Sequence, residues 1–167
     1  MKFHQPIYKT IQQFDPALLS DDRKDVLQIL IDYIQEKINQ HNEINLNFIC
    51  THNSRRSQFA QIWAQTSADY YDIPANCYSG GVEVTAFNER AVASIKRSGF
   101  SVTAKGDSNP VYLIFNGENS EPITAFSKRY DDPVNEAKIF AAVMTCSHAD
   151  ENCPFIPGAE RRFPLRF

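Results

Sequence analysis

One short segment of this 167-residue chain holds the residues best suited to chemistry. It reads Cys50-Thr51-His52-Asn53-Ser54-Arg55-Arg56-Ser57. The residues before it alternate in polarity as a strand does, and those after it have helical spacing. In a strand–loop–helix connection, successive backbone N–H groups converge, and the helix N-terminus adds partial positive charge. We therefore expect residues 51–56 to bind a tetrahedral oxyanion.

The side chains of this segment suit the same purpose. Arg56 can give two parallel charge-assisted hydrogen bonds to oxygens of the anion. The positive field also stabilises a thiolate at Cys50, and Ser57 can donate its hydroxyl to the sulfur. A cysteine that ends a strand is more often a small buried hydrophobe. Because packing explains no part of the polar run that follows, the sequence favours Cys50 as a nucleophile.

Two further cysteines lie seven positions apart. Cys146 follows an apolar run at 140–145 that predicts a buried strand, so it should lie at the carboxyl edge of the sheet with Cys50. Cys153 lies in a polar segment that we expect to be exposed and movable. Two thiols can supply two electrons by forming a disulfide. The alternatives are inert packing and a zinc site of Cys146, His148 and Cys153, whose spacing fits no common structural zinc pattern. We expect no metal or other cofactor.

Composition narrows the classes of protein. The net charge of −3 argues against broad nucleic-acid binding, and no apolar run approaches the ~20 residues of a membrane span. The first residues lack the apolar core of a signal peptide, so we expect a cytoplasmic protein. Four cysteines are too few for a disulfide-dense secreted scaffold.

The positioning elements follow from periodicity. We predict a helix of about 20 residues capped by Ser20, and a strand over 44–50. We also predict a helix after residue 56, a short strand at 77–79, a helical stripe over 87–95 ended by Gly99, a hairpin within 111–126 and a strand at 140–145. Residues 1–19 show no clear period, with Pro6 and Pro16 as breakers. The alternation predicts an α/β fold with a largely parallel sheet and one antiparallel excursion.

The 50–57 segment resembles the signature loop of low-molecular-weight protein tyrosine phosphatases and of the thioredoxin-coupled arsenate reductases that share their fold. The resemblance implies a three-layer sandwich over 44–167, with 1–43 as a helical extension and the hairpin as an insertion. It makes Cys50 the nucleophile, Arg56 the anion clamp, Ser57 the thiolate stabiliser and Asn53 the brace of the loop. Two positions depart from the family's pattern: His52 replaces a usual glycine, and Arg55 a common cysteine.

The second cysteine pair resembles that of the thioredoxin-coupled reductases. By that resemblance Cys50 attacks arsenate, Cys146 attacks the adduct and releases arsenite, and Cys153 resolves the disulfide for thioredoxin. The family's Asp-Pro acid has no counterpart after Cys153, so we expect the domain to lack the final acid loop and helix. His52 and Asp150 are the substitute acids considered.

Three functions therefore stay open. The first is arsenate reduction, and the second is hydrolysis of phosphotyrosine or a small phosphate ester. The third is an oxyanion-binding or redox-sensing module with little turnover.

Overall fold

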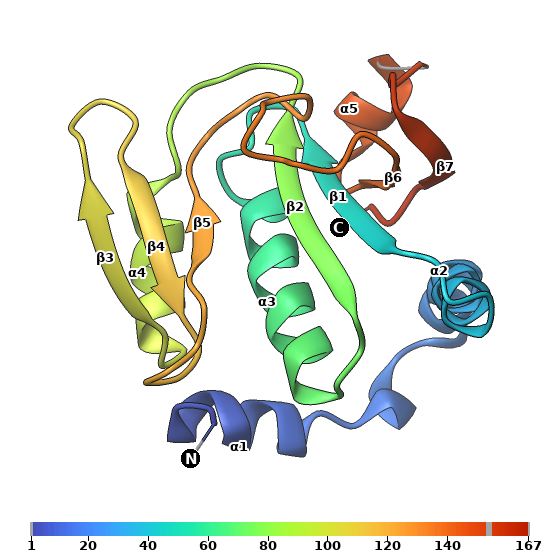
Figure 1. Cartoon of the computed structure of the whole chain (residues 1–167), viewed down its shortest axis with the longest axis horizontal. Helices are drawn as coiled ribbons and strands as arrows, with labels where there is room; N and C mark the ends of the chain where they lie inside the picture. The colour runs from blue at the N-terminus through green and yellow to red at the C-terminus, as the bar shows by residue number, and fades with distance from the viewer. Residues whose placement is uncertain (1, 153–154, 167) are drawn as a thin grey trace.

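The computed structural model describes residues 2–152 and 155–166. A four-stranded parallel sheet with strand order β2-β1-β6-β7 forms its centre (Figure 1). The strands are β1 (Ile44–Cys50), β2 (Ala75–Gly81), β6 (Phe140–Met144) and β7 (Ala159–Phe163). β1 pairs with β2 on one side and with β6 on the other, and all seven of its residues are buried. The carboxyl end of β1 therefore meets its neighbours at one edge, where parallel α/β sheets bind ligands.

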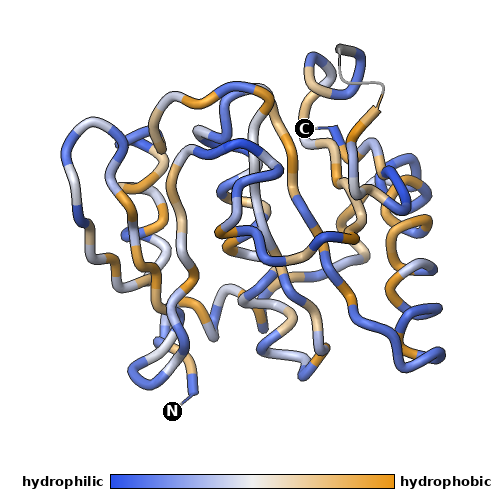
Figure 2. The backbone as a smooth tube through the Cα atoms, turned by 45° about the horizontal axis from the view of Figure 1, so that its top comes forward, coloured by the Kyte–Doolittle hydropathy of each residue, from blue (hydrophilic) through white to orange (hydrophobic). Residues whose placement is uncertain are grey.

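Two helices cover one face of this sheet. α2 (Asp21–Asn39) buries Leu30 and Tyr33 in the same cluster as Leu46 and Phe48 of β1. Its N-cap is Ser20, whose hydroxyl accepts a hydrogen bond from the Arg23 N–H at 3.3 Å, as predicted. Figure 2 shows the apolar residues of α2 recurring at intervals along the helix. α3 (Arg56–Tyr70) packs beside α2 in this cluster through its alanines.

The other face is covered mainly by irregular chain. Tyr130, in the segment between β5 and β6, packs with Ile49, Phe140 and Met144. The short helix α5 (Ser147–Asn152) adds Ala149 to the same cluster. The segment between β5 and β6 therefore reaches the edge at which β1 ends.

A second, antiparallel sheet has the order β3-β4-β5. Its strands are β3 (Ser101–Lys105), β4 (Val111–Phe115) and β5 (Ile123–Ala125). The β4–β5 pair is the predicted hairpin, and β3 extends it into a sheet separate from the parallel one. It shares a core cluster with α1 (Gln5–Gln13), with α4 (Glu89–Arg97) and with Ile62 of α3. α3 thus lies between the two sheets (Figure 1).

Several elements were not predicted, among them α1, β3 and β7. In α1, Pro6 occupies the first turn, where a missing N–H costs nothing, so it begins the helix instead of breaking it. Ile7 and Ile11, four residues apart, are the buried positions of this helix. β3 has no buried residue, and β7 carries two arginines, so neither shows the alternation that reveals a strand. Within the described part of the chain, no helix is long and apolar enough to span a bilayer.

Candidate active site

The loop between β1 and α3 encloses a small cavity of about 30 Å³. It is lined by Cys50, Thr51, His52, Ser54, Arg55 and Arg56. Cys50 is the last residue of β1, and α3 begins at Arg56. The residue before α3, Arg55, makes no side-chain cap, so no such cap competes with a bound anion for the first N–H groups of α3. The predicted anion-binding residues, except Asn53, thus surround one small space.

A chain of hydrogen bonds determines which group donates in the contact between Ser57 and the Cys50 thiol. The Lys128 N–H donates to Asn53 Oδ1 at 3.1 Å, which turns the amide nitrogen of Asn53 toward Ser57. That nitrogen donates to Ser57 Oγ at 2.8 Å. Because Ser57 Oγ already accepts this bond, its own proton can point at Cys50 Sγ, 3.0 Å away. The Ser57 hydroxyl is thus placed to donate a hydrogen bond to the Cys50 sulfur.

The loop is held in one unusual backbone conformation. Asn53 is fully buried and has φ = 46°, in the left-handed region. Gln58 donates to the Asn53 carbonyl at 2.9 Å, and Ser127 donates to the His52 carbonyl at 2.7 Å. The left-handed residue of the loop is Asn53 and not His52. His52 Nε2 pairs with Glu83 Oε2 at 3.1 Å, and both side chains are more than half exposed.

The end of β2 lies directly against this loop. A Cβ atom added at Gly81 would lie 2.8 Å from the Asn53 nitrogen and 2.8 Å from the Thr51 carbonyl oxygen. Gly81 therefore permits the close approach, since any side chain would push the loop away. The Ser54 hydroxyl donates to the Ala86 carbonyl at 2.6 Å, so it braces the loop instead of pointing at an anion.

Cys146 lies beside the loop, as the strand register requires. The Thr145 N–H donates to the Ile49 carbonyl at 2.8 Å, which places the residues after β6 next to those after β1. Cys146 is 1% exposed, and its Sγ lies 3.6 Å from Thr51 Oγ1. Thr51 Oγ1 also lies 3.2 Å from His148 Nδ1. The third predicted thiol, Cys153, lies outside the described residues.

Of the two substitute acids, Asp150 is held as a carboxylate. Burial acts to raise its pKa, but hydrogen bonds from Arg162 and Arg166 outweigh burial and lower the pKa below its ordinary value. A carboxyl group with a lowered pKa is already ionised at neutral pH, so it has no proton to donate as a general acid. His52 lies on the loop itself and remains the candidate of the pair.

Known proteins with similar sequences are named for one activity. An arsenate reductase of Brevibacillus brevis is 30% identical over 116 residues, which are 70% of this chain and 69% of that protein. An arsenate reductase of Bacillus cereus is 31% identical over the same shares. Arsenate reductase 2 of Staphylococcus saprophyticus is 33% identical over 66% of each chain. The chain belongs to the arsenate reductase family.

No family model matches the chain. The crystal structure of a YwlE mutant from Bacillus subtilis aligns with a TM-score of 0.41 and 16% identity, covering 71% of each chain.

In this member of the arsenate reductase family, the anion cavity is not lined by Tyr70, Tyr71 or Tyr130. Tyr70 and Tyr71 lie at the end of α3 away from Arg56, its first residue. Tyr130 is 9% exposed and packs in the core on the second face of the sheet. Among the described residues, no phenylalanine, tyrosine or tryptophan lines the loop cavity.

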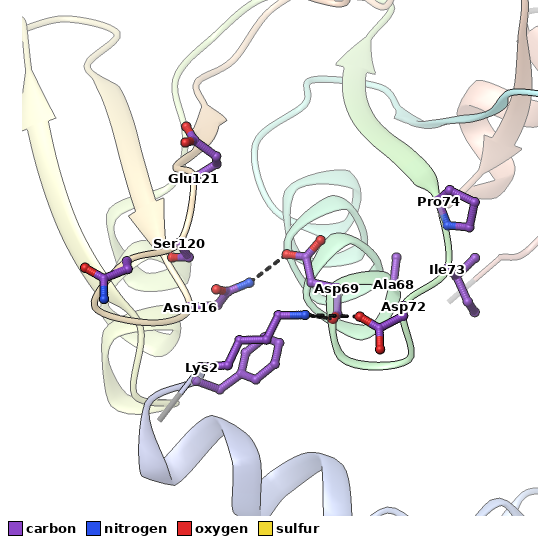
Figure 3. Close-up of a pocket in the computed structure, with 11 residues that line it drawn as sticks. Lys2, Ala68, Asp69, Asp72, Ile73, Pro74, Asn116, Ser120 and Glu121 are labelled. Atoms are coloured by element: carbon purple, nitrogen blue, oxygen red, sulfur yellow. Dashed lines mark hydrogen bonds and ion pairs between the residues drawn. The ribbon is translucent and has the colours of Figure 1, made fainter.

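A larger cavity of about 510 Å³ lies by the last residues of α3 (Figure 3). Lys2 reaches over the helix end to the Asp69 carbonyl at 2.7 Å and to the Asp72 carboxylate at 3.3 Å. Asn116 donates to the second carboxylate oxygen of Asp69 at 2.9 Å. These groups join the N-terminal segment to α3 and to the loop after β4. In the described part of the chain, no three His, Cys, Asp or Glu side chains are grouped as metal ligands would be.

Several residues that hold the loop escaped the sequence analysis. Gln58 follows the motif directly, and its amide also reaches the Phe126 carbonyl at 2.8 Å. Its position directly after the motif was the local signal that could have singled it out. Its burial, which is unusual for a glutamine, is visible only in the structure. Ser127 and Lys128 lie some 70 residues beyond the motif, and no local pattern marks them. Thr51 was expected only to bind the anion, and its contacts with Cys146 and His148 depend on strand register.

Proposed function

We propose that this protein reduces arsenate to arsenite through Cys50, Cys146 and Cys153, with thioredoxin as the electron donor. One observation carries the proposal: the Thr51 hydroxyl, on the anion loop, lies 3.6 Å from the sulfur of Cys146. Hydrolysis of a phosphate ester needs one thiol, whereas reduction needs a second thiol close to the first. The names of the sequence relatives support the same reaction.

In the first step, arsenate binds in the loop. The N–H groups of residues 52–56 and the Arg56 guanidinium would bind its oxygens. Cys50, with the Ser57 hydroxyl 3.0 Å from its sulfur, attacks arsenic. An arsenate oxygen leaves as water and a thiol–arsenate adduct remains. The small size of the cavity suits an inorganic oxyanion.

In the second step, Cys146 attacks the sulfur of Cys50. A disulfide forms, and the electron pair of the sulfur–arsenic bond stays with arsenic, which is reduced from the +5 to the +3 state. Because Cys146 is buried, an outside reductant needs another thiol to reach the bridge. We assign that role to Cys153, and the final Cys146–Cys153 disulfide to thioredoxin. A relay of this kind needs a reducing compartment, so the proposal places the protein in the cytoplasm.

The phosphatase alternative has less support. A phosphotyrosine pocket needs apolar walls for the ring, and no phenylalanine, tyrosine or tryptophan among the described residues lines the cavity. We further propose that residues 1–43 form an extension of a catalytic domain at 44–167. α1 and α2 of this extension pack against the rest of the chain through Ile7, Ile11, Leu30 and Tyr33.

The decisive experiment is turnover of arsenate with thioredoxin and its reductase, run beside hydrolysis of an aryl phosphate. Cys153→Ser should stop after one turnover and accumulate a Cys50–Cys146 disulfide, which peptide mapping detects. Cys146→Ser should release no arsenite. Aryl phosphate hydrolysis, where present, should survive both changes because it transfers no electrons. Absence of the Cys50–Cys146 link from arsenate-treated Cys153→Ser would rule out the reductase assignment.

A further inference from the structure

We propose that His148 takes up, through the Thr51 hydroxyl, the proton that Cys146 loses when it attacks Cys50. The inference rests on the proposed reductase function. Its basis is a continuous line of three groups: Cys146 Sγ, Thr51 Oγ1 at 3.6 Å, and His148 Nδ1 a further 3.2 Å away. The line connects a thiol to a base through a group that can both accept and donate a proton.

Because the Cys146 thiol is buried, its proton needs a path to the surface. Cys146 is 1% exposed, so water has little access to its proton in this state. His148 lies on the surface of α5 and can pass a proton to solvent. Thr51 has a single hydroxyl proton. Transfer toward His148 therefore requires Thr51 to accept from the Cys146 thiol and to donate to Nδ1, with the neutral imidazole protonated at Nε2.

The other described titratable side chains near these groups contact different partners. Asp150, two residues after His148, is bound by Arg162 and Arg166. Glu151 faces Arg166 at 3.7 Å. His52 Nε2 pairs with Glu83 Oε2 at 3.1 Å. His148 is thus the described base that contacts the Thr51 hydroxyl.

The step balances with the proton included. Cys146 Sγ bonds to Cys50 Sγ, and the Cys50 sulfur–arsenic bond breaks with its electron pair left on arsenic. The two sulfurs are oxidised to a disulfide while arsenic goes from +5 to +3. The thiol proton moves to Thr51 Oγ1 as the Thr51 proton moves to His148. An oxygen of the departing arsenite then receives a proton from His148 or from solvent.

The test measures one step in the Cys153→Ser protein, which should stop at the Cys50–Cys146 bridge. The rate of bridge formation after mixing with arsenate is followed by quenching and peptide mapping. His148→Gln keeps a hydrogen-bond acceptor for Thr51 but cannot take a proton, and should slow the step by roughly 10²-fold. His148→Ala should be equally slow, and added imidazole should restore it. Thr51→Val should be slow and insensitive to imidazole, because the connecting hydroxyl is gone.

Two measurements separate this role from a structural one. Phosphate affinity, measured by calorimetry, should be unchanged in both His148 variants, because His148 does not line the anion cavity. The alkylation rate of Cys146 should fall in parallel with bridge formation. A wild-type bridging rate in His148→Gln, or a slow His148→Ala that imidazole does not restore, would overturn the inference and leave the reductase standing. Failure of any bridge to form with His148 intact would overturn the reductase assignment, and this inference with it.

Discussion

The backbone N–H of Lys128 donates a hydrogen bond to the side-chain oxygen of Asn53, across 75 positions of sequence. Because this bond fixes the orientation of the Asn53 amide, it also sets the direction of the bonds to Ser57 and on to Cys50. The hydrogen bond at the nucleophile therefore depends on the segment between β5 and β6, on the second face of the parallel sheet. The buried side-chain amide of Asn53 thus connects the anion loop to the segment between β5 and β6.

Replacing Asn53 should loosen the loop in a graded way. Asn53→Gly keeps the left-handed backbone but removes the amide, leaving buried partners unsatisfied at a cost of about 1–3 kcal/mol of unfolding free energy. Asn53→Ala should cost roughly 1 kcal/mol more, since a Cβ is disfavoured at φ = 46°. Urea unfolding measures both, and both variants should alkylate more slowly at Cys50. An alkylation rate equal to wild type would show that the amide does not support the thiolate.

Arg56→Lys should weaken phosphate binding about tenfold or more, because lysine cannot form the planar fork to two oxygens. Arg55→Lys is the matched control, one position earlier on the same cavity wall. It should lose much less affinity, since Arg55 is not assigned the clamp. Titration calorimetry with phosphate at low salt measures both. Equal losses in the two variants would mean that general positive charge, and not the fork, holds the anion.

Features that depend on residues close together in the sequence could be predicted, whereas contacts between residues far apart in the sequence could not. The alternation of Ile44, Leu46 and Phe48 marks β1 without any neighbour, and the polar run after Cys50 marks the loop. The apolar run before Cys146 predicts a buried parallel strand, and hence the edge that the two cysteines share. These features depend on local chemistry and on one topological rule.

Contacts set by tertiary packing could not be predicted in this way. Ser127 and Lys128 follow a short strand, and nothing near them in sequence indicates that they hold the anion loop. The three-stranded antiparallel sheet also went beyond the predicted hairpin, because β3 has no buried side chain. The prediction that Pro6 disrupts the N-terminal segment was wrong, since proline is tolerated in the first turn of a helix.

Cys50 should react with iodoacetamide far faster than Cys77 near neutral pH. Burial, followed by the nearby charge of Asp69, raises the pKa of the Cys77 thiol to about 12, so almost none of it is thiolate. Mass spectrometry of timed samples should find Cys50 modified first. Cys77→Ser should keep this fast phase and Cys50→Ser should lose it. A fast phase that survives in Cys50→Ser would assign the nucleophile to another cysteine.

Lys128→Met should stabilise the protein, and the gain should shrink as pH rises. The Lys128 ammonium is 1% exposed and, among the described residues, has no hydrogen-bond partner; it lies 4.9 Å from the centre of the Phe126 ring. Burial lowers its pKa from 10.5 to about 8, against the opposing charge of Asp132. Below pH 8 both folded and unfolded chains carry this proton, so the full cost of burying the charge is present. That cost is about 3 kcal/mol at most.

Between pH 8 and 10.5 the unfolded chain keeps the Lys128 proton while the folded chain loses it, so this contribution to stability rises with pH. The advantage of Lys128→Met, measured by urea unfolding at neutral pH as about 1–3 kcal/mol, should therefore vanish through this window. Lys128→Arg is the control, because arginine stays charged throughout and should remain destabilised. Comparing each variant with wild type at the same pH cancels other titrations, such as that of Cys77. An advantage of Lys128→Met that stays constant or grows with pH would show that the pKa of Lys128 is not lowered in the folded protein.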